Sequence, residues 1–130
     1  MKAKSELRAH RLSEHFTHVW LLTSDDDRCR SEEFLRGLEL ADFTKMLVVL
    51  KRADTDVTYR HAERFKQLSH SVFEFKTHRH RLLCFKTARG FVLTDCMKKQ
   101  KSSRTRVSDA AVESTGRLAS RFAKEGIYVE

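Results

Sequence analysis

The chain has no proline, only four glycines among its 130 residues and no long apolar run. Without proline-rich or glycine-rich stretches, nothing marks a flexible linker between domains. The longest apolar run, residues 46–50, is far shorter than the roughly 20 residues that span a bilayer, and the N-terminus lacks the apolar centre of a signal peptide. We therefore expect one soluble domain over residues 1–130, located in the cytoplasm and without a membrane partner.

Cysteine is also scarce. Cys29, Cys84 and Cys96 cannot all pair with one another and show no CxxC spacing, so a disulfide framework is not expected. A zinc site that combines Cys84 and Cys96 with His78 and His80 can be written down, but it lacks the paired ligand spacing of zinc sites. We predict no metal and no cofactor.

Acidic residues are nearly missing from one part of the chain. Residues 76–106 contain ten cations and a single acid, Asp95, so this segment carries +9 while the whole chain carries +8. Such segregation is expected of a protein that binds a polyanion, because neutralising phosphates releases condensed counterions. A basic face that only keeps the protein soluble is the alternative, although solubility does not require segregation by sign.

The first half of the chain predicts one strand and two helices. Residues 16–23 are rich in aromatic and β-branched residues and end at a turn-like Ser-Asp-Asp-Asp run, which is typical of a strand. Ser31, followed by two acids, resembles a helix N-cap and predicts a helix over residues 31–38. Apolar spacing of i, i+3, i+4, i+7 predicts a second helix over residues 40–53. Residues 1–14 are polar and predict a short helix or a mobile arm.

The second half changes to period two. Apolar residues alternate over residues 71–77, 80–87 and 90–98, and the short connections predict an antiparallel meander. Ser108 then predicts the N-cap of a C-terminal helix. The order β-α-α-β-β-β-α predicts a small α+β fold, in which helices cover one face of an antiparallel sheet and leave the other face free.

The basic strands resemble those of a known toxin family. The segments KQLSHSVFEFK at residues 66–76, HRLLCF at residues 80–85 and FVLTDCMKKQK at residues 91–101 follow one another with short turns. In this order they resemble the RelE/HigB-type toxins, and most of all the phage-derived HigB-like branch of the RelE/ParE superfamily.

The resemblance implies a RelE/ParE-like fold and a toxin of a type II toxin–antitoxin pair. Such toxins are mRNA interferases: they cleave messenger RNA on the ribosome, inhibit translation and need no metal. The implied partners are the ribosome, messenger RNA and a cognate antitoxin, a HigA-like helix-turn-helix protein through which the pair would reach operator DNA. A ParE-like gyrase inhibitor, or another non-catalytic binding module of this fold, is the alternative, because a fold does not fix a function.

RNA supplies its own nucleophile, the 2′-OH, so the protein must supply positioning, charge stabilisation and proton transfer. His78 and His80 are the candidates for proton transfer because imidazole titrates near neutral pH. Arg81 is the first candidate to bind the reacting phosphate, because guanidinium matches phosphate geometry; an ion pair with Glu74 across the hairpin is its alternative role. Lys98 completes the predicted catalytic set. The predicted RNA-binding residues are Arg64, Lys66, Lys76, Arg79, Lys99 and Lys101.

Overall fold

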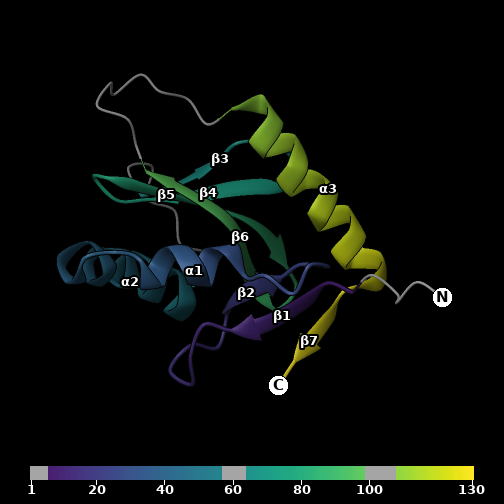
Figure 1. Cartoon of the computed structure of the whole chain (residues 1–130), viewed down its shortest axis with the longest axis horizontal. Helices are drawn as coiled ribbons and strands as arrows, with labels where there is room; N and C mark the ends of the chain where they lie inside the picture. Colours follow the sequence, from purple (N-terminus) through teal and green to yellow (C-terminus); the bar gives the residue numbers. More distant parts are fainter. Residues whose placement is uncertain (1–5, 57–63, 99–107) are drawn as a thin grey trace.

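The computed structural model describes residues 6–56, 64–98 and 108–130, and within them a single sheet with helices against it (Figure 1). The seven strands are ordered β3-β4-β5-β6-β2-β1-β7 across that sheet. In chain order the elements are β1 (Arg8–Arg11), β2 (Val19–Thr23), α1 (Arg30–Arg36), α2 (Leu40–Thr55), β3 (Phe65–Gln67), β4 (Val72–Lys76), β5 (His80–Thr87), β6 (Gly90–Lys98), α3 (Asp109–Glu125) and β7 (Ile127–Val129).

The predicted meander is confirmed. Strands β4, β5 and β6 pair antiparallel in sequence order, and the bounds of β5 and β6 match the ranges expected from period-two alternation. The register shifts between Leu83 and Cys84, so that β6 carries one extra residue there.

The three predicted helices are also present. The apolar spacing located α2 to within two residues at its C-terminus. The side chain of Ser108 caps α3 by accepting a hydrogen bond from Ala111 N, as predicted. The predicted N-cap of α1 was wrong, because Cys29 occupies that position and Ser31 is a buried residue inside the helix.

The sheet is mixed, which corrects the prediction of a purely antiparallel sheet. Strand β2 runs parallel to β6, and β1 runs parallel to β7. Short turns can indicate the direction of successive strands only, because a two- or three-residue connection forces an antiparallel neighbour. The pairing of β2 with β6 joins strands that are about 70 positions apart in the sequence. The spacing of nearby residues does not indicate such distant partners.

Helices lie on both faces of the sheet, so the predicted free face is wrong as well. Val19 and Leu21 of β2 belong to a cluster that includes residues of α1 and α2. Trp20 and Leu22 belong to a second cluster that includes Phe122 of α3. Figure 1 shows α1 and α2 on one side of the sheet and α3 on the other. Alternate residues of β2 therefore belong to two apolar cores, whereas the sequence predicted helices on only one face of the sheet.

Three short strands were not predicted. Leu7, just before β1, and Ala9 within it are fully buried, while Arg8 and His10 are less so, a period-two pattern in the segment expected to be a helix or an arm. The part of that segment before residue 6 lies outside the described residues. Strands β3 and β7 have three residues each and close the two edges of the sheet. Runs this short carry too few apolar positions for a periodic signal.

Gly90 holds the meander against the N-terminal part of the sheet. It begins β6 with φ of +120°, and the next residue, Phe91, donates its N–H to the carbonyl oxygen of His18 over 2.8 Å. A Cβ atom on residue 90 would lie 2.1 Å from that oxygen. The parallel pairing of β2 with β6 therefore requires a glycine here, for both its backbone angle and its missing side chain.

We expect Gly90→Ala to lower the free energy of unfolding by more than about 1 kcal/mol, because alanine adds a positive-φ strain and a backbone clash. Gly37→Ala is the matched control: Gly37 has φ of −82°, and an added Cβ would make ordinary contacts at 3.5 Å. Denaturant unfolding of both variants measures the difference. Equal stability of the two variants would contradict the role given to Gly90.

Candidate nucleic-acid interface

Most of the predicted site residues lie at one end of the sheet, where β4 ends, β5 begins and β6 ends. Lys76 is paired with Arg81 across β4 and β5, and His80 is paired with Lys98 across β5 and β6. Directly opposed residues have Cβ atoms about 4.5–5.5 Å apart on the same face. Because consecutive strand residues point to opposite faces, the Lys76–Arg81 pair and the His80–Lys98 pair lie on opposite faces of this end.

A row of cations marks the face that α3 covers. Arg64 O accepts a hydrogen bond of 2.7 Å from Lys76 N, which places Arg64 in line with Lys76 and Arg81. Lys66 is paired with Glu74 one row along the sheet and points to the same face. We call Arg64, Lys66, Lys76 and Arg81 the cationic row. Lys76 and Arg81 are like charges in directly opposed positions, which destabilises a sheet.

One buried acid lies within the cationic row. Glu74 is only 1% exposed, and Arg81 Nη1 donates to Glu74 Oε2 over 3.3 Å. The alternative role that the sequence left open for Arg81 is thus present in the structure. Arg81 balances a carboxylate that would otherwise be buried without a countercharge, and its side chain is itself only 15% exposed.

His80 lies on the opposite face, in a pocket of about 370 Å³ between the end of the sheet and the helices α1 and α2. It is 5% exposed, its ring makes an edge contact with Phe34 at 5.4 Å, and its Nδ1 has no hydrogen-bond partner among the described residues. Burial lowers the pKa of His80; Asp42 opposes the shift, and the cations Arg79 and Lys98 add to it. The ring is therefore neutral at pH 7 and can accept a proton.

The pocket around His80 has a mixed electrostatic lining. Arg79, exposed at the turn into β5, forms an ion pair of 3.6 Å with the buried Asp42 of α2. Lys98 completes one wall, and Glu33 and Glu39 lie on the helical side. Sequence reasoning selected Arg79, His80 and Lys98 but missed the three acids. Glu33 and Asp42 stand in the first turns of α1 and α2. Acids are common in first turns because they interact favourably with the helix dipole, so their position did not mark them as site residues.

The remaining predicted residues are placed differently. His78 is exposed in the turn between β4 and β5 and does not line the His80 pocket. Lys99 and Lys101 lie outside the described residues. The structure therefore brings His80 together with Lys98, and Arg81 together with Lys76, but separates these two pairs by the sheet itself.

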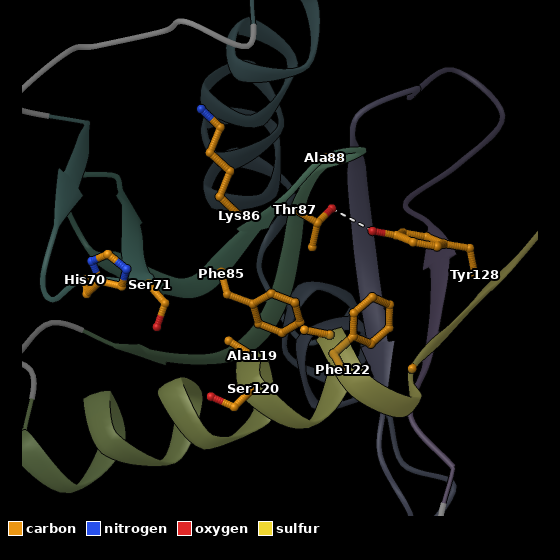
Figure 2. A pocket seen from close by; sticks show the side chains of 12 residues that line it. His70, Ser71, Phe85, Lys86, Thr87, Ala88, Ala119, Ser120, Phe122 and Tyr128 are labelled. Carbon is orange, nitrogen blue, oxygen red and sulfur yellow. Dashed lines mark hydrogen bonds between the residues drawn. The ribbon is translucent and has the colours of Figure 1, made fainter.

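A second, larger cavity lies on the α3 side of the sheet, as Figure 2 shows. Its volume is about 590 Å³, and its floor is aromatic, with Phe85 and Phe122 ring centroids 5.5 Å apart. Tyr128 Oη donates to Thr87 Oγ1 over 2.6 Å at one side. Lys86 lines the cavity, but its Nζ lies over the ring of Phe91, which belongs to the core on the other face. Of the predicted RNA-binding residues that the structure describes, Arg64, Lys66, Lys76 and Arg79, none lines this cavity.

All three cysteines are free, and burial raises the pKa of the Cys84 and Cys96 thiols. No three histidine, cysteine, aspartate or glutamate side chains within residues 6–56, 64–98 and 108–130 are grouped to hold a metal ion. Both thiols are thus protonated at pH 7 and do not act as nucleophiles there.

Comparison of the chain with models of known protein families gives no match, and comparison with curated proteins gives none either. In the part of the chain that the structure describes, none of the helices combines the length and apolar character needed to cross a membrane.

We expect the stability of the protein to fall as the pH is lowered below about 6.5, the ordinary pKa of histidine, partly because of His80. The unfolded chain protonates this ring there, while the folded chain, with a lowered pKa, binds the proton only at lower pH. His80→Asn should reduce the loss of unfolding free energy between pH 7.5 and 5.5. His15→Asn, at an exposed position, is the control and should leave that loss unchanged.

We expect Arg81→Ala to destabilise the fold by about 3–5 kcal/mol, because it leaves the buried Glu74 carboxylate without its partner. The double variant Glu74→Leu with Arg81→Met removes both charges and should recover most of the loss. Chemical denaturation of the single and double variants is the measurement. A double variant as unstable as the single one would show that the ion pair is not the reason.

Proposed function

We propose that the protein is a toxin of a type II toxin–antitoxin pair and a ribosome-dependent mRNA endoribonuclease. The observation that carries the proposal is the cationic row, in which Lys76 and Arg81 oppose each other and Arg64 stands in line with them. A phosphodiester backbone relieves this repulsion and gains affinity from counterion release. The resemblance of these strands to RelE/HigB-type toxins supports the same function.

The groups at this end of the sheet suit metal-independent cleavage of RNA. The 2′-oxygen attacks the adjacent phosphorus, the bond from phosphorus to the 5′-oxygen breaks, and a cyclic phosphate forms. A base must take the 2′-OH proton and an acid must give one to the leaving oxygen. His80, neutral at pH 7, is our candidate for the base, and exposed His78 is our candidate for the acid. Arg81 and Lys98 would stabilise the negative charge that builds up on phosphate.

The same surface suits the proposed partners. A cognate antitoxin could block the cationic row with an acidic segment that imitates the RNA backbone, since both ligands present negative charge to the same cations. The helix-turn-helix character of that antitoxin and its contact with operator DNA follow from the family resemblance. We also propose a cytoplasmic location, as expected from the sequence.

One observation favours a second function. The sheet separates His80 from Arg81, and Arg81 is already engaged with Glu74. A surface that only binds does not need those groups to meet. A non-catalytic relative, or a ParE-like inhibitor of gyrase, would use the cationic row without cleaving RNA.

Expression in cells separates the two functions. We expect growth arrest with mRNA ends that map in frame within codons; intact mRNA with arrested supercoiling would favour gyrase inhibition instead. His80→Asn should slow cleavage about 10²- to 10⁴-fold, the usual contribution of a general base. Arg81→Lys keeps a partner for Glu74 but loses the planar fork, so we expect a roughly 10- to 150-fold loss. His15→Asn, expressed to the same level, should cleave like the unaltered protein.

Salt dependence tests the RNA-binding face without requiring cleavage. Replacing Arg64, Lys66 and Lys76 together by Gln should make the plot of log affinity for single-stranded RNA against log salt shallower by about two units. The matched control replaces three exposed cations elsewhere, Lys45, Arg52 and Lys124. An equal change of slope in both variants would show a diffuse charge effect and would remove the cationic row from the binding site.

A further inference from the structure

The pocket around His80 has the features of a site that a ligand completes. His80 is only 5% exposed, yet its Nδ1 has no hydrogen-bond partner among the described residues. Most buried polar atoms in folded proteins have such a partner, because an orphaned one destabilises the fold. The aromatic ring of Phe34 lies beside it at 5.4 Å, and the space they border measures about 370 Å³.

Most charged groups of the pocket are paired, which leaves one carboxylate and one ammonium in addition to His80 Nδ1. Glu33 receives two hydrogen bonds from Arg28, of 2.6 and 3.2 Å, and Asp42 pairs with Arg79. Glu39 forms no ion pair or side-chain hydrogen bond with the described residues, although it stands at the N-cap of α2. Lys98 likewise forms no ion pair with them. The pocket therefore offers a carboxylate on one wall and an ammonium on the other.

This division excludes the simplest ligands. A phosphate against the Glu39 wall would be repelled by its carboxylate, and a free amine against the Lys98 wall would be repelled by its ammonium. A neutral, planar ligand with hydrogen-bond donors on one edge and acceptors on another satisfies both walls. Nucleobases have this character, and single-stranded RNA presents them unstacked, ready to lie against aromatic side chains and to bond through their edges.

We propose that this pocket binds a guanine base of single-stranded RNA. Guanine alone among the four bases carries two adjacent donors, N1–H and N2–H₂, which a single carboxylate can accept together. Its O6 and N7 are acceptors that lysine or arginine commonly contacts. Glu39 would accept from the donor edge, Lys98 would donate to O6 or N7, and Phe34 would lie against the ring. The inference rests on the proposed function, to which it adds a preference for one base.

Titration calorimetry with the full chain and the four nucleoside 5′-monophosphates tests this site. All four carry the same phosphate, so any difference between them comes from the base. We expect GMP to bind roughly 5- to 150-fold more tightly than AMP, CMP or UMP, the discrimination of one good bidentate contact. Equal affinity for the four would overturn the proposal.

Variants test whether Glu39 and Lys98 are responsible for the preference for GMP. Glu39→Gln should remove most of it, whereas Glu113→Gln, an exposed acid-to-amide change on α3, should leave it intact. Thermal unfolding checks that both variants are folded, and Lys98→Gln provides a second variant that should weaken GMP binding. A preference that survives Glu39→Gln in a folded protein would overturn the assignment of Glu39.

The outcome separates this inference from the proposed function. In-frame mRNA cuts in cells together with equal nucleotide affinities would reject the guanine site and leave the toxin function standing. A GMP preference with intact mRNA would support the guanine site and reject the endoribonuclease.

Discussion

The parallel pairing of β2 with β6 is the contact on which the rest of the structure depends. It joins the N-terminal strands β1 and β2, with β7 beside them, to the β3–β6 part of the sheet. All five residues of β2 are buried, as in a central strand that has both faces covered. Two cores therefore form, one under α1 and α2 and one under α3. The candidate site lies at the end of the sheet where β5 begins, between the sheet and the helices α1 and α2.

The sequence predicted the features that depend on neighbouring residues and missed those that depend on contacts between distant segments. Local signals worked: the period-two runs located β5 and β6, and Ser108 was recognised as a cap. The pairing and packing of β2, which depend on distant segments, were not predicted. The run Val-Trp-Leu-Leu-Thr of β2 indicates a strand, but continuous apolarity does not say that Trp20 packs toward α3 while Leu21 packs toward α2. The mixed sheet and the second helical layer could not be inferred for that reason.

The candidate site shows the same limit. Clustering of cations along residues 76–98 was visible in the sequence, and the structure gathers many of them at one end of the sheet. Alternation also implied that His80 and Arg81 face opposite ways, as neighbours in a strand must. The acids of the pocket could not be foreseen, because Glu39 and Asp42 meet His80 only through the packing of α2 against the sheet.

Three acids of the loop after β2 are paired with arginines that lie outside that loop. The Ser-Asp-Asp-Asp run after β2 is held in this way: Asp25 receives two hydrogen bonds from Arg121 of α3, of 3.0 and 3.1 Å. Asp26 pairs with Arg30, and Asp27, at a positive φ of 60°, pairs with Arg8. Exposed pairs of this kind add little to stability. Their common effect is to neutralise that loop, so that unbalanced positive charge remains near the cationic row.

A ligand that uses both His80 and Arg81 must cross the end of the sheet, and the side chains there differ in their freedom to move. His80 is buried and held between Phe34 and the sheet, so its position is fixed before a ligand arrives. Lys98 is exposed at the end of β6, and a lysine side chain on a flexible four-carbon stem can reach around a strand end. Arg81 cannot reach around the strand end in this way, because its side chain is hydrogen-bonded to Glu74. Any chemistry at this end would therefore depend on the fixed imidazole of His80 and the fixed guanidinium of Arg81. The longer, more flexible side chain of Lys98 would adjust to the backbone of the bound RNA.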